Sequence, residues 1–313
     1  MYTHQSYNVK NNVKNNVKNN VKKIYKHIRI IFLYMRLVNN LKTVLITGGT
    51  RGVGLELAKM FKKQNYNVII TGRDSNYSKK IAKKLNNINT NGIVKGYKLD
   101  FLDINGSSKL LNKLQDKTIQ PTILINNAGV LMLDNINNIT DKRLDTIFKV
   151  NTYGPILLSK LCKDHIWKTR EGGILFNSPP YQIDNKTTHL MPYMQSKLAQ
   201  TTFMKSLANS IPQSIPTDKH NIIVASFWTN YPLLTDAIIK RGIGKEEDCM
   251  HPAILSDTVK ELLFNTKNVS SYNGKEIIDE DFLNKRKIDI TKYKMSKNVS
   301  KLDKLFMNHL IKK

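Results

Sequence analysis

The chain is poor in the residues that build disulfide frameworks and metal-stabilised domains. Its 313 residues include only two cysteines, Cys162 and Cys249, too few and too isolated for a disulfide framework or a zinc site. None of the seven histidines stands at metal-ligand spacing from another. The composition therefore favours a protein of a reducing compartment, and we expect no metal.

Acidic residues are also scarce. There are 24 Asp and Glu residues against 50 Lys and Arg residues, which gives a formal net charge of +26. Such an excess favours contact with polyanions. However, no nucleic-acid-binding motif and no interleaving of aromatic and basic residues accompanies it. We interpret the charge as a lysine-rich solvated surface and expect no nucleic-acid partner.

A long apolar run is missing too, even from the amino terminus. Residues 8–22 repeat Asn-Asn-Val-Lys, which is too polar to bury a core and predicts disorder. Residues 23–38 have the pattern of a basic amphipathic helix, far too short to span a bilayer, so we expect no stable membrane insertion. We divide the chain into a basic low-complexity extension, residues 1–40, and one domain, residues 41–313.

The extension has no acidic residue and resembles a mitochondrial transit peptide, although serine is nearly absent from it. Its pattern favours the mitochondrion, with the cytoplasm or the peroxisome as alternatives. The final residues, Leu-Ile-Lys-Lys, are not the Ser-Lys-Leu peroxisomal address. Alternatively, translation begins at Met35 and no transit peptide is made.

From Thr43 onward, short apolar runs alternate with amphipathic segments. Apolar strands separated by helices favour a parallel sheet covered on both faces, so we predict an α/β, doubly wound parallel sheet, the Rossmann fold. The expected strands are Val44–Thr47, Val68–Thr71, Ile93–Leu99, Ile123–Asn126, Ile174–Asn177, Ile222–Phe227 and Glu276–Ile278.

A glycine-rich turn follows the first expected strand. Glycines permit a tight turn and close approach of a ligand, and the helix that follows points its free amide groups at a pyrophosphate. The turn therefore predicts a dinucleotide site that contains Gly48, Thr50, Arg51, Gly52, Val53 and Gly54.

The end of the second expected strand indicates which dinucleotide is bound. It has Arg73 where a carboxylate would repel a 2′-phosphate, although Asp74 follows immediately. Arg51 and Arg73 offer two guanidinium groups suited to a phosphate, which favours NADP(H) over NAD(H). The alternative is that both arginines pair with surface carboxylates.

Tyr193 and Lys197 stand four residues apart. If this stretch is helical, both side chains lie on one face, and the ammonium group favours ionisation of the phenol. Tyr193 then acts as a proton donor or acceptor nearer neutral pH. Alone, such a pair is weak support for an active site, because most pairs at this spacing are ordinary helix surface.

Four motifs occur together and in order: the glycine turn, Asn126-Asn127-Ala128-Gly129, Asn151, and Tyr193 with Lys197. In this the chain resembles the short-chain dehydrogenases/reductases, from about Leu41 to Asp279. Asn177-Ser178-Pro179-Pro180, Phe227-Trp228 and the stretch from Tyr272 to Asp281 resemble a hydroxysteroid dehydrogenase-like subgroup. The subgroup carries a sterol-carrier domain, for which we expect no room in this chain.

The resemblance implies roles for individual residues. Tyr193 would exchange a proton with the substrate, Lys197 would bind the ribose and lower the pKa of the tyrosine, and Asn151 would hold a water in a proton relay. Cofactor contacts would also come from Asp100, Asn127, Ala128, Gly129 and Thr235. Relatives are often dimers or tetramers, so a homo-oligomer is expected.

The chain departs from the family at the catalytic serine. Ser178 is followed by Pro179 where a pair resembling Ser-Ser is usual, and proline has no donor group. Ser178 polarises the carbonyl if the turn shifts by one residue; otherwise it only caps a turn.

Two functions remain open on these residues. The first is an NADP(H)-dependent oxidoreductase that interconverts a carbonyl and an alcohol on an apolar or lipid-like small molecule. The second, favoured by Pro179, is a catalytically impaired nucleotide-binding sensor or scaffold. Retention of Asn151, Tyr193 and Lys197 argues for the enzyme.

Overall fold

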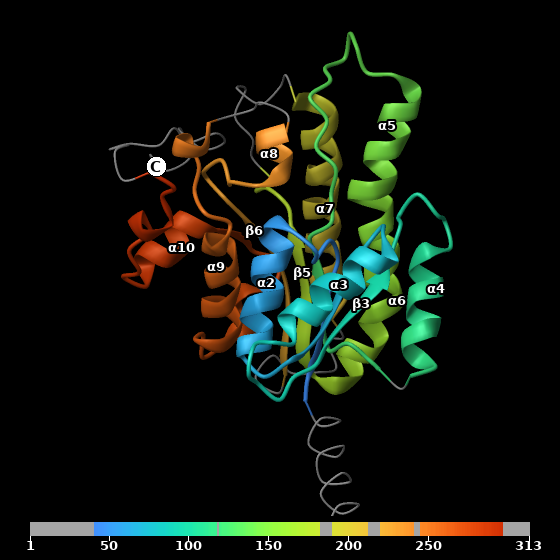
Figure 1. The fold of residues 1–313 in the computed structure, drawn as a ribbon, viewed down its shortest axis with the longest axis vertical. Coiled ribbons are helices and arrows are strands. Elements are labelled where there is room, and N and C mark those ends of the chain that lie inside the picture. Colours follow the sequence, from blue (N-terminus) through green and yellow to red (C-terminus); the bar gives the residue numbers. More distant parts are fainter. Residues whose placement is uncertain (1–40, 118, 182–189, 212–219, 241–244, 297–313) are drawn as a thin grey trace, which may run out of the picture. The chain divides into compact units, whose positions relative to one another are not determined.

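The structure is a computed structural model that describes residues 41–117, 119–181, 190–211, 220–240 and 245–296 (Figure 1). The basic extension predicted for residues 1–40 lies outside the described residues. The division at residue 40 and the transit peptide therefore stay predictions.

Seven parallel strands form one sheet in the order β3-β2-β1-β4-β5-β6-β7. This confirms the predicted doubly wound sheet. The chain winds outward from β1 to β3, returns to place β4 beside β1, and then winds outward in the other direction. The strands are β1 (Thr43–Ile46), β2 (Asn67–Gly72), β3 (Val94–Lys98), β4 (Ile123–Asn126), β5 (Glu171–Asn177), β6 (Asn221–Trp228) and β7 (Glu276–Ile278).

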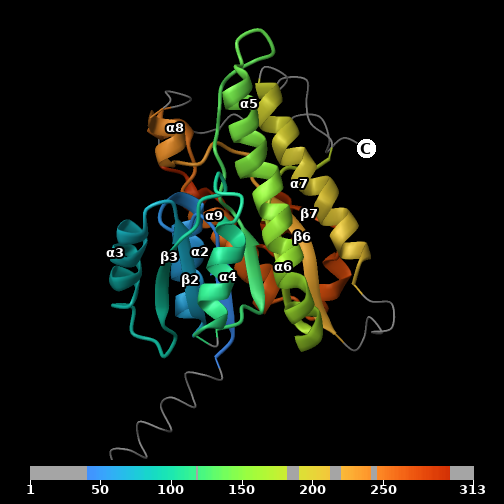
Figure 2. The ribbon, with the colours of Figure 1, turned by 90° about the vertical axis from the view of Figure 1, so that its right-hand side faces the viewer.

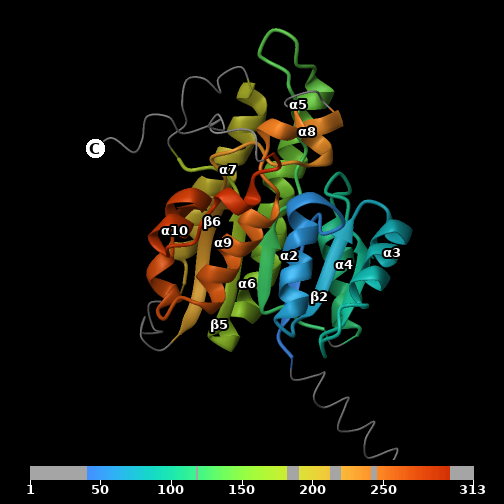
Figure 3. The same cartoon turned by 60° about the vertical axis from the view of Figure 1, so that its left-hand side comes forward.

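Helices cover both faces of the sheet. Figure 2 shows α4, α6 and α7 over one face, and Figure 3 shows α2 and α9 over the other. The helices are α2 (Gly52–Lys63), α3 (Ser75–Leu85), α4 (Gly106–Gln115), α5 (Asp141–Phe148), α6 (Gly154–Thr169), α7 (Met191–Asn209), α8 (Asp236–Lys240), α9 (Ala253–Phe264) and α10 (Asp279–Lys285).

Two hydrophobic cores hold the layers together, because successive side chains of a strand point to opposite faces. In β1, Val44 and Ile46 belong to the core beneath α2 and α9, whereas Leu45 belongs to the core beneath α4, α6 and α7. All three are fully buried. The continuous apolar strands in the sequence are thus explained by a sheet that is buried on both faces.

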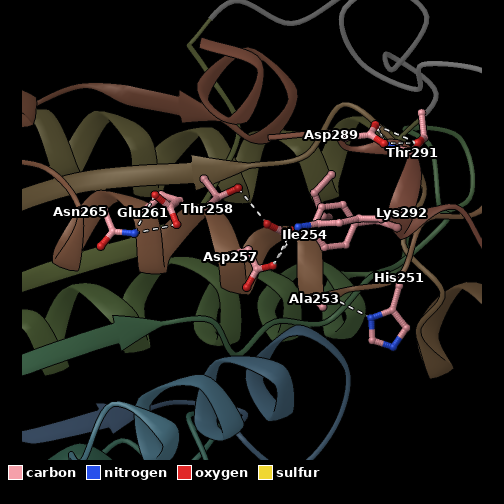
Figure 4. A network of polar contacts seen from close by, with 11 residues as sticks. His251, Ala253, Ile254, Asp257, Thr258, Glu261, Asn265, Asp289, Thr291 and Lys292 are labelled. Carbon is pink, nitrogen blue, oxygen red and sulfur yellow. Dashed lines mark hydrogen bonds and ion pairs between the residues drawn. The ribbon is translucent and has the colours of Figure 1, made fainter. Parts of the chain in front are cut away.

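The last described segment packs against α9. Figure 4 shows His251, whose Nδ1 accepts a hydrogen bond of 3.1 Å from the N–H of Ala253 at the start of this helix. The hydroxyl of Tyr293 donates to the carboxylate of Asp257, and the N–H of His251 donates to the carbonyl of Tyr293 over 2.7 Å. These bonds fix the chain after α10 to the body of the domain.

Candidate active site

A cleft of about 950 Å³ opens at the carboxyl ends of the strands, where the strand order reverses between β1 and β4. Ligands of doubly wound sheets bind in this crevice. Thirteen of the sixteen predicted site residues line it: Gly48, Thr50, Arg51, Gly52, Val53, Arg73, Asp100, Asn127, Ala128, Gly129, Tyr193, Lys197 and Thr235. Gly54, Asn151 and Ser178 do not. The cleft is large enough for a dinucleotide and a small substrate.

The glycine turn has the backbone that its sequence requires. Gly48 has φ +66° and Gly52 has φ +52°, both in the left-handed region that favours glycine. A Cβ atom on Gly54 would lie 2.3 Å from the carbonyl oxygen of Gly48, so only glycine lets α2 approach the turn. No side chain caps the amino end of α2. Its first amide groups are therefore available to an anion.

Three strand ends are joined by a chain of polar contacts that leads to Lys197. The Nδ2 of Asn127 donates to the carbonyl of Thr47 over 3.0 Å, and its Oδ1 accepts from the Nδ2 of Asn177 over 3.1 Å. The carbonyl of Asn177 accepts from the Nζ of Lys197 over 2.9 Å. The end of β1 is thereby linked through β4 and β5 to α7.

The residues around the expected 2′-phosphate position are two arginines and one carboxylate. Arg51 lies 3.5 Å from Asp236 in an exposed ion pair, and such pairs are worth only about 0–1 kcal/mol. The side chain of Arg73 makes no hydrogen bond or ion pair with the described residues. Asp74 caps α3 by accepting the N–H groups of Asn76 and Tyr77. Its carboxylate is thus directed at that helix.

Tyr193 and Lys197 both lie on α7, which confirms the helix expected there. Burial raises the pKa of the Tyr193 phenol and lowers the pKa of Lys197 to about 8. This differs from the expected lowering of the tyrosine pKa, because loss of hydration disfavours the charged form of each side chain. Among the described residues, the only hydrogen-bond acceptor for Lys197 is the Asn177 carbonyl.

Asn151 lies in a short π-helical segment, Lys149–Tyr153, between α5 and α6, and is fully buried. Its amide exchanges two hydrogen bonds with the backbone of Val130, of 2.8 and 2.9 Å, and donates a third to the Ser196 hydroxyl over 3.0 Å. The Nε2 of Gln200 donates to its backbone carbonyl. Asn151 therefore fixes the loop after β4 to α7, and its place in a water relay stays a prediction.

Ser178 is fully buried behind the cleft. Its hydroxyl lies 2.9 Å from the hydroxyl of Thr201, which also contacts the carbonyl of Pro179. The structure does not bring Ser178 to the cleft that contains Tyr193, so its role as a carbonyl-polarising group stays a prediction.

The family of the protein follows from comparison with known sequences. The family model described as short chain dehydrogenase matches residues 42–226. The chain belongs to the short-chain dehydrogenase family. The match begins at β1 and ends within β6, so it covers the glycine turn, Asn151, Tyr193 and Lys197.

Curated relatives of this short-chain dehydrogenase include hydroxysteroid dehydrogenase-like protein 2 from several vertebrates. The Xenopus laevis protein is 25% identical over 273 residues, which are 85% of this chain and 63% of the relative. The human protein is 27% identical over 254 residues, which are 79% of this chain and 58% of the relative. The chain thus spans about three fifths of the length of these relatives, and the resemblance to the subgroup is confirmed.

Solved structures share the fold. A short chain dehydrogenase from Mycobacterium thermoresistibile aligns with a TM-score of 0.71 at 24% identity, over 84% of this chain and 93% of that one. An actinorhodin polyketide ketoreductase, solved with NADPH, aligns with a TM-score of 0.65 at 18% identity, over 77% of this chain and 96% of that one.

Sequence reasoning missed several residues that build the site. Asn177 was noted only for its neighbours, yet its carbonyl holds Lys197. The rule that parallel strands end at one edge of a sheet would have found it, because Asn127 directly follows β4 and Asn177 is the last residue of the neighbouring β5. The sequence gives Trp228 only a resemblance to the subgroup, yet this residue lines the cleft together with Tyr231 and Leu233.

Within the described ranges, no group of three or more His, Cys, Asp or Glu side chains is arranged to hold a metal ion. In the same part of the chain, no helix is both long enough and apolar enough to cross a membrane.

Proposed function

We propose that the protein is an NADP(H)-dependent oxidoreductase that interconverts a carbonyl and an alcohol. The observation that carries the proposal is the shared cleft: the glycine turn and the pair Tyr193 and Lys197 line one continuous space. A dinucleotide held by the turn and a substrate beside the tyrosine would then be neighbours.

The chemistry needs one hydride and one proton. A nicotinamide bound in the cleft would supply the hydride chemistry at the carbonyl carbon. Tyr193 would give a proton to the oxygen during reduction or take it back during oxidation. Burial raises the pKa of the Tyr193 phenol, so the phenol is protonated at neutral pH and is available as the proton donor for reduction. Lys197, held by Asn177, would stabilise the phenolate that remains.

Support for NADP(H) over NAD(H) comes from Arg51, Arg73 and Asp74. The two arginines line the cleft, and the weak ion pair of Arg51 costs little to exchange for a phosphate. The Asp74 carboxylate is engaged in capping α3. The NADPH bound by the actinorhodin ketoreductase agrees with this choice.

Support for an apolar substrate comes from the wall of the cleft near Tyr193. Trp228 packs against Tyr193. Other apolar residues that line the same cleft are Val130, Leu131, Leu133, Leu190, Pro232 and Ile238. The name of the relatives, hydroxysteroid dehydrogenase-like, is in line with a ligand of this kind. A lipid-like ketone or alcohol therefore fits the wall best.

One observation favours the second function, a nucleotide-binding sensor or scaffold with impaired catalysis. The hydroxyl of Ser178 is buried against Thr201 and is not part of the cleft. An enzyme that uses this hydroxyl to polarise the carbonyl would have to rearrange the turn after β5.

We expect Ser178→Ala to change the rate of carbonyl reduction by less than about threefold, because its hydroxyl faces Thr201. The measurement is kcat/KM with NADPH, with Thr201→Val as the control that removes the other partner of the same contact. A loss of about a hundredfold in Ser178→Ala alone would instead identify an oxyanion donor. That result would require the turn to shift during catalysis.

We also propose a mitochondrial location, supported only by the acid-free basic sequence of residues 1–40. A fluorescent protein fused behind these residues should enter mitochondria and lose the segment, as seen by microscopy and electrophoresis. The control fusion begins at Met35. Cytosolic fluorescence of the full-length fusion would contradict the proposal.

A further inference from the structure

The wall of the cleft behind Tyr193 begins where β6 and β7 end side by side. Trp228 is the last residue of β6, Ile278 is the last residue of β7, and both are nearly buried. The ring of Tyr193, which is partly buried, packs against this pair. The orientation of the phenol therefore depends on where these two strand ends lie.

The chain after Trp228 turns sharply and is held by two carboxylates. Asp279 and Glu280 follow β7 directly and open α10. The N–H of Asn230 donates to Asp279 over 3.2 Å, and the Nδ2 of Asn230 donates to one oxygen of Glu280 over 2.8 Å. The hydroxyl of Tyr231 donates to the other oxygen of Glu280 over 2.9 Å.

Glu280 thus connects two side chains of the turn to the neighbouring strand end. Tyr231 is only 7% exposed and lines the cleft, so the bond to its hydroxyl fixes a ring that forms part of the wall. Charge-assisted hydrogen bonds of this kind are roughly twice as strong as neutral ones. Other contacts also hold the turn: Trp228 pairs with Ile278 in the sheet, and the Thr229 hydroxyl exchanges two hydrogen bonds with the backbone of Tyr231. Glu280 therefore acts on the side chains of Asn230 and Tyr231.

We infer that Glu280 is a positioning residue for proton transfer: it clamps Asn230 and Tyr231 and so fixes Trp228 behind the ring of Tyr193. The inference rests on the proposed function, because it assigns Glu280 to the geometry of the proposed proton donor. Glu280 itself does not line the cleft and touches no reacting atom.

Replacement of Glu280 by alanine should lower kcat for carbonyl reduction by about tenfold to a hundredfold, since a displacement of about 1 Å at a reacting group can cost a hundredfold. The loss should appear in kcat and kcat/KM alike, because a positioning defect acts on the transition state. The Kd for NADPH should stay within about twofold. Asp279 is unsuitable for this test, because it also accepts two backbone N–H groups.

Two conservative variants distinguish a positioning role of Glu280 from a role in folding. Glu280→Gln should restore most of kcat: its amide oxygen accepts from Tyr231, and its NH₂ donates to Asn230 after the amide of Asn230 rotates. The Oδ1 of Asn230 is buried without a partner and is free to accept that bond. Tyr231→Phe removes one of the two hydrogen bonds that side chains of the turn donate to Glu280, and should lower kcat by about threefold to tenfold.

The matched control is Tyr293→Phe. It also removes a hydrogen bond between a phenol and a carboxylate, here that of Asp257 on α9, but neither residue lines the cleft. We expect it to leave kcat unchanged. If Tyr293→Phe and Tyr231→Phe lose kcat equally, a general loss of protein stability would explain both effects. That result would overturn the inference.

Tryptophan fluorescence tests the position of Trp228 without any enzyme turnover. In a Trp167→Phe background, Trp228 is the remaining tryptophan, and its emission reports on the wall. Glu280→Ala should shift the emission to longer wavelength and increase quenching by acrylamide, whereas Glu280→Gln and Tyr293→Phe should not. Unchanged emission in Glu280→Ala, or normal kcat despite changed emission, would refute the inference.

A wild type that binds NADPH but reduces no ketone would refute the proposed enzymatic function instead. The emission of Trp228 would still show whether Glu280 holds this part of the wall in place.

Discussion

Tyr193→Phe is expected to lower kcat for carbonyl reduction by about a hundredfold to ten-thousandfold, the usual contribution of a positioned proton donor. The change removes one hydroxyl from the wall of the cleft and leaves the ring packed against Trp228 and Ile278. The phenol proton is the one delivered to the oxygen of the substrate, and burial keeps it in place at neutral pH. Steady-state kinetics with NADPH and a panel of apolar ketones measures the loss.

Binding of NADPH should survive the same change, because the glycine turn and both arginines are intact. Fluorescence titration of the variant gives the Kd directly. Tyr66→Phe is the matched control, since Tyr66 is a partly buried tyrosine that packs on Phe61 and Phe264 away from the cleft. Full activity of Tyr193→Phe would assign the proton to another group. A wild type without any activity on the panel, but with tight binding of NADPH, would support the sensor or scaffold.

The parts of this site that could be predicted depend on local sequence. The glycine turn is readable because Gly48 and Gly52 adopt backbone angles that few other residues tolerate, and the strand and helix on either side are adjacent in sequence. Likewise, Tyr193 and Lys197 share one helix, so their spacing alone sets their relation. The apolar strands predict the sheet for the same local reason.

The remaining features depend on residues that are distant in sequence. Ser178 turns toward Thr201, which is 23 residues away on α7, and only the packing of this helix on the end of β5 reveals that contact. Glu280 reaches Tyr231 across 49 residues because β6 and β7 are neighbours. Pattern analysis identifies the strands but not their final neighbours, so neither contact was predictable.

The pKa of Tyr193 shows the same limit. Spacing predicts an ammonium group beside the phenol, but spacing carries no information on burial or on competing acceptors. The structure directs Lys197 to the carbonyl of Asn177, and partial loss of hydration shifts the pKa of both side chains. The pKa of each then follows from lost hydration, which the three-dimensional packing determines.

Replacement of both Arg51 and Arg73 by alanine is expected to remove most of the preference for NADPH. A charge-assisted hydrogen bond to a phosphate contributes about 1.5–3 kcal/mol, so each arginine accounts for roughly tenfold to a hundredfold in affinity. The double variant should bind NADPH at least about a hundredfold more weakly. Its affinity for NADH should stay within about threefold, because that dinucleotide has no 2′-phosphate. Titration of both dinucleotides at fixed ionic strength measures the ratio.

The matched control for this prediction is Lys80→Ala. Lys80 is an exposed cation on α3, the helix that Asp74 caps, but it does not line the cleft. Its loss tests whether the overall positive charge of the chain, rather than direct contact, attracts the extra phosphate. If the single variants Arg51→Ala, Arg73→Ala and Lys80→Ala all bind NADPH equally more weakly than the wild type, the result would point to such general attraction. Equal affinity of the wild type for NADPH and NADH would instead remove the assignment, and the arginines would then serve chiefly as surface partners, as the contact between Arg51 and Asp236 already illustrates.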